Sequence, residues 1–188
     1  MSGPSTSEKP RPVEAVDAAL FRRVLGRVPT AVSVVTAEGA DGPVGVTVGS
    51  FTSVSLDPPL VAFFCGLHSA SAAAIAAAGR FCVNVLAEDQ QRQCAAFASR
   101  TGDRFASGAF DAGENGAPQL RDAIAWIECE VDSTFEAGDH LAIMGRVQRM
   151  TAAGSDRRPL VFYQGRLVKL DSAAVRHAPS HPFAWWDA

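Results

Sequence analysis

The sequence predicts a mainly β fold with flanking helices, in the form of an antiparallel barrel. Many short β-branched or alternating segments follow one another at close spacing, and only two or three stretches have helical character. No G-x-G-x-x-G motif follows a strand, so a doubly wound nucleotide-binding sheet is not expected. The 188 residues, 47% of them hydrophobic, suffice for one core. We expect a disordered arm over residues 1–12, one domain over 13–172 and a tail over 173–188.

The first half of the chain begins with helical periodicity that ends at Gly26, after which β-branched residues take over. Asp57-Pro58-Pro59 is a stop signal between two strands, and Ser69 and Gly79 are suited to cap the two ends of a helix. The predicted elements are a helix over 13–25, a strand over 31–37, a turn over 38–43, a strand pair within 44–61, a buried strand over 60–64 and a helix from 69 to 78.

The second half alternates more regularly and predicts antiparallel pairing. Residues 127–132 alternate strictly between apolar and charged, which is typical of a half-exposed strand. Gly138-Asp139 and Gln164-Gly165 are predicted turns. The predicted elements are a strand over 81–86, a helix over 88–98, a long ordered loop over 100–118, a strand over 140–150 and a closing hairpin of 160–163 with 166–170.

The run from Val44 to Val61 is the most informative for function. It places Thr47, Ser50, Thr52 and Ser53 among glycines, where a strand that only packs would carry Val, Ile or Phe. Short hydroxyls beside glycines suit close approach to a polar, phosphate-bearing ligand. A β-meander that is merely rich in Ser and Thr is the alternative.

Two further segments offer groups for an anion or a ring. Ser69 and Ser71 open the predicted helix, where unpaired N–H groups and the helix dipole favour a phosphate; an ordinary Ser cap is the alternative. His140 follows a tight turn, and residues 162–166 combine aromatic rings, a glycine and Arg166. Neither G-x-S-x-G nor H-E-x-x-H occurs, so the hard chemistry is expected to belong to a bound cofactor.

Charge and cysteine usage exclude several classes of function. A net charge of −3 argues against a nucleic-acid surface, and no apolar run approaches the roughly 20 residues that span a bilayer. The cysteines Cys65, Cys82, Cys94 and Cys129 form no C-x-x-C pair and no zinc-ligand spacing with the histidines. We therefore expect no metal, reduced thiols and a cytoplasmic protein.

Together, these segments resemble the flavin reductase family. Residues 34–36, 45–59, 81–86, 138–140 and 160–166 match its motifs in the same order, over about residues 21–170. The resemblance implies a split β-barrel of the FMN-binding type, usually a homodimer. It also implies hydride transfer from NADH or NADPH to FMN or FAD, and supply of reduced flavin to a separate monooxygenase.

The resemblance also implies roles for individual residues. The isoalloxazine ring would contact residues 47–50 largely through backbone groups, the ribityl chain would lie near Ser53, and the phosphate near Ser69 and Ser71. His140 is the implied catalytic residue and would contact the nicotinamide nucleotide together with residues 163–166. The implied cofactor-binding residues are Thr47, Val48, Gly49, Ser50, Phe51, Ser53, Ser69, Ser71, Asn84, Phe105, Tyr163, Gly165 and Arg166.

The chain departs from the family's pattern at two positions, and two other functions compete. Many relatives carry Asn where Gly49 stands and an aromatic residue where Leu167 stands. One competing function is a flavin-binding oxidase or oxygenase that holds flavin tightly and does not use nicotinamide. Another is a non-catalytic interaction module, for which Trp185-Trp186 is the one positive indication. No basic cluster points to the 2′-phosphate of NADPH, which favours NADH.

Overall fold

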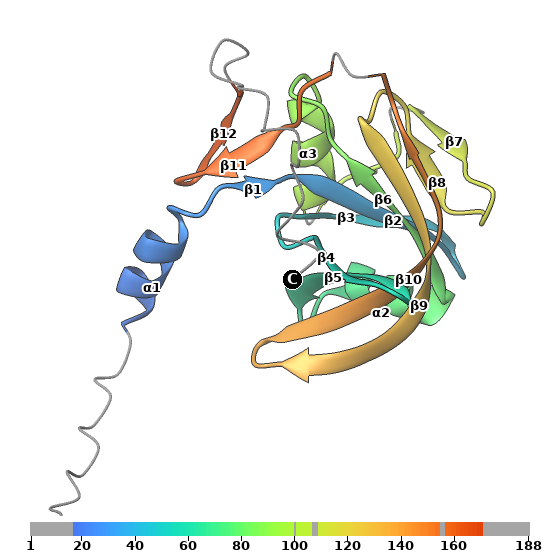
Figure 1. Ribbon diagram of the computed structural model, residues 1–188, viewed down its shortest axis with the longest axis horizontal. Helices are drawn as coiled ribbons and strands as arrows, with labels where there is room; N and C mark the ends of the chain where they lie inside the picture. Colours follow the sequence, from blue (N-terminus) through green and yellow to red (C-terminus); the bar gives the residue numbers. More distant parts are fainter. Residues whose placement is uncertain (1–16, 100, 107–108, 155–156, 171–188) are drawn as a thin grey trace, which may run out of the picture.

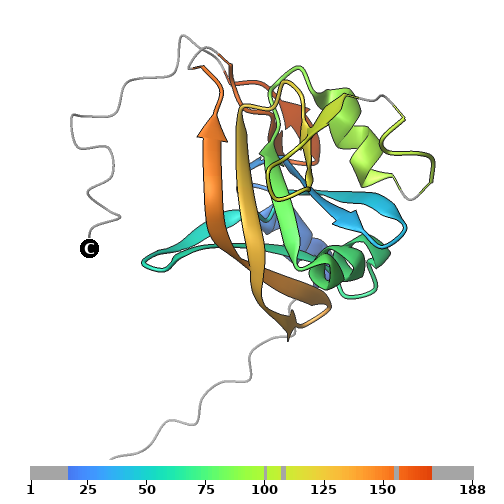
Figure 2. The same ribbon diagram turned by 90° about the vertical axis from the view of Figure 1, so that its right-hand side faces the viewer.

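A computed structural model describes residues 17–99, 101–106, 109–154 and 157–170. Seven antiparallel strands curl into a barrel that is open between its two edge strands, with helices outside it (Figures 1 and 2). The predicted fold class, mainly β with flanking helices, is confirmed. The elements are α1 (Ala18–Leu25), β1 (Thr30–Ala31), β2 (Ser33–Gly39), β3 (Gly42–Val48), β4 (Thr52–Leu56), β5 (Pro59–Gly66), α2 (Ala70–Ala78), β6 (Arg80–Val85), α3 (Gln91–Ala98), β7 (Phe110–Ala112), β8 (Pro118–Leu120), β9 (Ala125–Ala137), β10 (His140–Ala152), β11 (Val161–Tyr163) and β12 (Arg166–Val168).

The main sheet has the order β3-β2-β6-β9-β10-β5-β4, so β3 and β4 are its edges. These two strands are joined by only three residues, 49–51, and the chain therefore crosses the open seam of the barrel there. The run singled out in the sequence thus contains both edges of the sheet. The predicted arm at 1–12 and tail at 173–188, with Trp185 and Trp186, lie outside the described residues.

The predicted strand over 31–37 is two strands, because Val32 joins two different sheets. Its N–H donates to Leu160 O at 2.9 Å, and its carbonyl accepts from Leu86 N at 3.0 Å. β1 before it pairs with β11 in a three-stranded sheet, and β2 after it pairs in the barrel. The predicted turn over 38–43 is also shorter than expected, because Gly39 pairs with Gly42 and leaves two residues at the tip.

Helix α2 begins and ends where the sequence predicts. Ser69 Oγ accepts from Ala72 N at 3.2 Å, and Gly79 ends the helix with a left-handed φ of 72°. The helix predicted over 88–98 starts only at Gln91, because Glu88 N donates to Arg158 O at 2.8 Å and residues 87–90 form a turn closed by the hydrogen bond from Gln90 N to Ala87 O at 3.0 Å.

Helices α2 and α3 cover opposite faces of β2. Ile75 of α2 is fully buried with Val35, whereas Phe97 of α3 packs in a second cluster with Val34. Gly45 of β3 permits this close packing of α3, since a Cβ there would lie 2.6 Å from Phe97 Cε1. The barrel therefore has one core inside it and another beneath α3.

The long strands and the predicted loop both contain more pairing than expected. The strand predicted over 127–132 extends to Ala125–Ala137, because β9 pairs with β6 on one side and with β10 on the other. The loop predicted over 100–118 includes β7, which pairs with β8 in a short hairpin. Phe105 anchors this segment by edge-to-face contacts with Phe97 and Phe110, at centroid distances of 4.9 and 5.0 Å.

The closing hairpin of β11 and β12 turns at Gln164 and Gly165, as predicted. Their φ values of 50° and 76° are both positive, which is the requirement of a type I′ turn. Gln164 N donates to Gly26 O at 2.9 Å and so ties this turn to the end of α1. α1 has no buried residue and extends away from the barrel (Figure 1).

Candidate functional site

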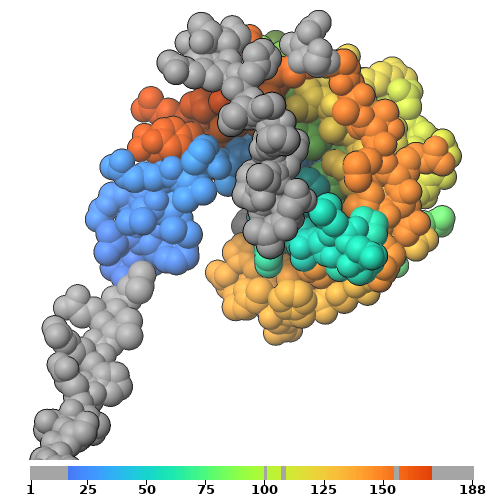
Figure 3. Space-filling view, viewed as in Figure 1, coloured from blue at the N-terminus to red at the C-terminus, as the bar shows by residue number. Residues whose placement is uncertain are grey.

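A cleft of about 1090 Å³ opens where β3 and β5 end at the seam of the barrel. Figure 3 shows the surface hollowed between α1 and the end of the β9–β10 hairpin. The cleft is mostly apolar and has a few polar groups, as small-molecule sites usually do. It is lined by Phe21, Leu25, Gly26, Val28, Thr30, Val46, Thr47, Val48, Gly49, Ser50, Phe64, Cys65, Gly66, Ser69, Ala137, His140 and Phe162.

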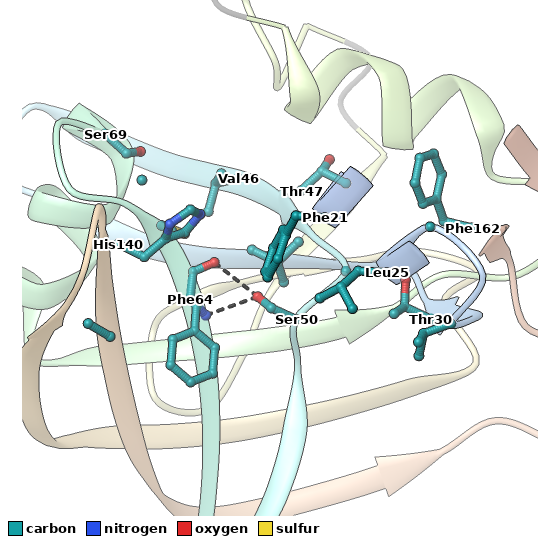
Figure 4. Close-up of a pocket in the computed structure, with 17 residues that line it drawn as sticks. Phe21, Leu25, Thr30, Val46, Thr47, Ser50, Phe64, Ser69, His140 and Phe162 are labelled. Carbon is teal, nitrogen blue, oxygen red and sulfur yellow. Dashed lines mark hydrogen bonds between the residues drawn. The ribbon is translucent and has the colours of Figure 1, made fainter. Parts of the chain in front are cut away.

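One wall of the cleft is the end of β3 and the residues that follow it. Thr47 Oγ1 donates to Cys94 O at 2.9 Å, so this hydroxyl points to α3. Ser50 Oγ donates to Phe64 O at 2.9 Å and accepts from Phe64 N at 3.0 Å (Figure 4). These hydroxyls hold the wall in place, which leaves mainly backbone groups of residues 47–50 to face a ligand.

Gly49 lies against Thr30 at one end of this wall. A Cβ on Gly49 would lie 2.9 Å from Thr30 Oγ1, closer than real side chains approach. Both residues line the cleft, so the Thr30 hydroxyl lies beside the position where the resemblance to the family implies Asn. Thr30 therefore supplies a polar group that the sequence pattern did not reveal.

His140 lies at the start of β10, across the cleft from α1. Its Nδ1 is 2.6 Å from Asp139 Oδ1, which leaves Nε2 as the ring nitrogen not engaged by Asp139. The pKa of Asp139 is lowered, mainly by its hydrogen bond with His140 and, to a smaller extent, by the charge of His140. Leu67 N donates to Asp139 O at 2.9 Å, so the turn before His140 is fixed to the loop after β5.

Ser69 and Ser71 begin α2, but only Ser69 lines the cleft. Ser71 Oγ accepts from Arg104 Nη1 at 2.6 Å, and the same nitrogen donates to Gly45 O at 2.8 Å. Arg104 also donates twice to Ser99 O, at 3.1 and 2.7 Å, and is thereby held beside the helix start. A serine hydroxyl that accepts a hydrogen bond still carries its own donor, so this corner can donate to an anion.

The structure brings six of the thirteen predicted cofactor-binding residues, together with His140, to the cleft or to a pocket beside it. Thr47, Val48, Gly49, Ser50 and Ser69 line the cleft with His140, and Gly165 lines a neighbouring pocket. The structure does not bring the others to the cleft wall: Phe51, Ser53, Ser71, Asn84, Phe105, Tyr163 and Arg166.

Asn84 illustrates why some polar residues lie away from the cleft. It is fully buried, and its Nδ2 donates to Val34 O and Thr36 Oγ1, both at 3.0 Å. Its Oδ1 accepts from Leu120 N at 2.7 Å, so the side chain joins β2 to β8. Ser53, in contrast, lies on exposed β4.

Sequence reasoning singled out the aromatic segment 162–166 but missed Phe21, Leu25, Thr30 and Phe64 in the cleft. With Phe162, these residues come from four separate segments, and their convergence depends on the tertiary fold. Figure 4 shows Phe21 and Leu25 from α1 over the β3 wall, with Thr30 and Phe162 beyond them. For Phe21 and Leu25, the one signal in the sequence was the helical periodicity that ends at Gly26.

The cysteines of the structure are free and buried. Burial raises the pKa of the Cys65 thiol to about 11 and that of Cys129 to about 12, so both are protonated at neutral pH. Within the described ranges, no group of three or more His, Cys, Asp or Glu side chains is placed to hold a metal ion. None of the three helices described above has the length and apolar character needed to cross a bilayer.

Comparison with known proteins identifies the family. Residues 25–171 match the flavin reductase like domain. The chain belongs to the flavin reductase family. A flavin reductase of Pseudomonas putida is 45% identical over 152 residues, which cover 80% of this chain and 89% of that protein. The reductase subunit HsaB of a flavin-dependent monooxygenase from Rhodococcus jostii is 41% identical over 166 residues, covering 88% and 85% of the two chains.

Solved structures of flavin reductases share the fold. Component B of nitrilotriacetate monooxygenase from Mycobacterium thermoresistibile superposes with a TM-score of 0.83 at 39% identity, covering 88% of this chain and 93% of that one. The NADH:FAD oxidoreductase SgcE6 of Streptomyces globisporus, in complex with NAD and FAD fragments, gives 0.80 at 36% identity, covering 87% and 100%. The predicted family and split-barrel fold, and the predicted class of enzyme, a flavin oxidoreductase, are confirmed for this flavin reductase.

Proposed function

We propose that this flavin reductase transfers hydride from NADH or NADPH to FMN or FAD and supplies the reduced flavin to a separate monooxygenase. The carrying observation is the cleft: a backbone wall at 47–50, apolar side chains opposite, and His140 and Ser69 at its rim. Its volume of about 1090 Å³ lies just above the roughly 300–1000 Å³ of ligand pockets, room enough for two stacked rings. The monooxygenase names of HsaB and component B support the partner.

The chain's own contribution is binding, orientation and exclusion of water. The flavin, when bound, supplies the hydride-accepting ring, and no side-chain base is required for that step. Backbone N–H groups of residues 47–50 are suited to fix the ring edge and to stabilise negative charge that develops there. Phe21 and Leu25 cover the cleft with apolar surface. Rings bound beneath them would be shielded from water and held against each other.

A steady-state assay tests this function. The purified protein is mixed with each of the four pairs of FMN or FAD with NADH or NADPH, and the loss of reduced nicotinamide absorbance is followed. Multiple turnovers with at least one pair are expected. No turnover with any pair, together with flavin that survives dialysis at one per chain, would instead support the oxidase that does not use nicotinamide.

We also propose that the protein is a homodimer and works in the cytoplasm. Leu20, Phe21, Val24 and Leu25 of α1 are 44–55% exposed, an apolar helix face that a second copy would cover. Since Phe21 and Leu25 also line the cleft, the second copy would complete the site. Sedimentation should give about twice the 19.7 kDa of one chain. The free, buried cysteines support a reducing compartment.

His140→Ala is expected to raise the KM for NADH by about five- to tenfold, on the scale of about 1 kcal/mol for one lost hydrogen bond. The affinity for flavin should change less than twofold, because residues 47–50 and Ser69 remain. Initial rates at varied NADH and fluorescence titration of FMN measure the two effects. Glu136→Ala on the same hairpin is the control. A loss of flavin affinity with unchanged nicotinamide kinetics would overturn this role of His140.

Ser69→Asp separates the two roles of this residue, which are capping of α2 and the proposed contact with the flavin phosphate. Aspartate caps helices as well as serine does, so the free energy of unfolding should change little. A carboxylate beside the proposed phosphate position repels it, and flavin affinity should fall about tenfold. Unchanged flavin affinity in Ser69→Asp would mean that the phosphate lies elsewhere.

The double variant in which Ser69 and Ser71 are both changed to Ala should lose roughly one to three kcal/mol of flavin-binding free energy.

A further inference from the structure

We propose that a second, basic pocket next to the cleft binds the phosphate groups of the nicotinamide dinucleotide; this rests on the proposed function. The pocket has a volume of about 390 Å³ and lies between the end of α1 and the turn of the β11–β12 hairpin. Arg22, Arg23 and Arg27 line it with Gly26, Gln164 and Gly165. Three arginines that line one pocket provide guanidinium chemistry suited to phosphate.

Backbone contacts bring the arginines and the turn together. The hydrogen bond from Gln164 N to Gly26 O, 2.9 Å long, places the tip of the hairpin against the end of α1. The pairing of Thr30 with Phe162 continues this contact into the three-stranded sheet. These backbone contacts bring the two sides of the pocket together, and its arginine side chains are exposed.

Arginines near the end of a helix also offset the negative end of its dipole, which gives Arg22 and Arg23 a simpler explanation. This explanation does not reach Arg27, which lies beyond the helix and faces the same pocket. Among the carboxylates of the described residues, none lies within 4.0 Å of any of the three guanidinium groups. Three neighbouring positive charges repel one another, and a pyrophosphate would relieve that repulsion.

The position of the pocket selects the ligand. Gly26 borders both the cleft and the basic pocket, so a molecule with a ring in the cleft can extend past Gly26 to the arginines. Ser69, the proposed neighbour of the flavin phosphate, lies at the other side of the cleft from Leu25 and Thr30 (Figure 4). The arginines are thus placed to bind the nicotinamide dinucleotide rather than the flavin phosphate. The charge of Arg22 also contributes, as the smallest of several effects, to the lowered pKa of Asp139 beside His140.

The test compares the wild type with the double variant Arg23→Gln/Arg27→Gln, which removes two charges and keeps unbranched polar side chains. The KM for NADH is expected to rise at least tenfold, whereas the affinity for FMN, measured by fluorescence, changes less than twofold. Inorganic pyrophosphate should inhibit the wild type competitively against NADH and should inhibit the variant at least tenfold more weakly. Raising the salt concentration should raise the KM of the wild type more than that of the variant.

Arg80→Gln is the matched control, because Arg80 is exposed at the start of β6 and lines neither pocket. Calorimetric titration of NADH into both proteins gives a readout that does not depend on turnover. If the wild type binds NADH more tightly than the variant but reduces no flavin, the proposed function fails and the basic pocket stands. An unchanged KM and an unchanged binding constant for NADH, or an equal loss of FMN affinity, overturn the pocket.

Discussion

Gly49→Val is expected to weaken flavin binding by about a hundredfold, or about 2.8 kcal/mol. Even a Cβ at this position would lie 2.9 Å from Thr30 Oγ1, and the valine methyl groups would add bulk to the cleft wall itself. The wall would have to move away from Thr30 toward the ligand, or the side chain would occupy ligand space. Fluorescence titration with FMN and with FAD measures the loss, and urea unfolding checks that the fold is retained.

A rescue experiment isolates the contact with Thr30. Gly49→Ala alone is expected to lose about tenfold in flavin affinity, the equivalent of about 1.4 kcal/mol. In Gly49→Ala/Thr30→Ala the crowding atom is gone, since the next contact of the added Cβ is the Thr30 Cβ at 3.8 Å. The double variant should recover most of the affinity. If it binds no better than the single variant, the role of Gly49 is something other than space beside Thr30.

Phe81→Ala is expected to lower the free energy of unfolding by about 3–5 kcal/mol. Phe81 is fully buried inside the barrel, and its ring meets Phe63 edge to face at a centroid distance of 5.4 Å. Its Cζ also fills the space above Gly145 and leaves no room for a Cβ there. No single neighbour can fill the cavity that the truncation leaves. Urea unfolding followed by tryptophan fluorescence measures the effect.

Phe135→Ala removes the same ring from a position that is 52% exposed and is the matched control. It should cost less than half as much as Phe81→Ala, because little apolar surface is removed from the interior. Equal losses in the two variants would contradict the assignment of Phe81 to the centre of the core.

Much of the fold could be predicted because local chemistry decides it. Ser69 and Gly79 define the ends of α2, and the alternation in residues 127–132 identifies β9. Where the prediction was wrong, the reason was pairing with distant residues. Val32 divides one predicted strand because its backbone forms hydrogen bonds with Leu160 and Leu86. The helix predicted from residue 88 starts late because the backbone N–H of Glu88 donates a hydrogen bond to Arg158.

The site could be predicted only along its backbone wall, for the same reason. Residues 47–50 are contiguous, so their composition already indicates a ligand surface. The hydroxyls in that run were expected to face the ligand, yet those of Thr47 and Ser50 bond to Cys94 and Phe64. Thr30 could not be found in this way, because the pairing of β1 with β11 brings it to the cleft beside Phe162.

The attachment of α1 has a consequence for how the barrel opens. α1 buries no side chain, and the bond from Gln164 N to Gly26 O joins its end to the hairpin. Such a segment can detach at a small fraction of the global unfolding free energy, since little apolar surface is exposed when it leaves. In a single copy of the chain, α1 can thus open separately from the sheet beneath it. In the proposed homodimer the second copy covers the apolar face of α1, so ligand exchange by this route would be coupled to the contact between the two copies.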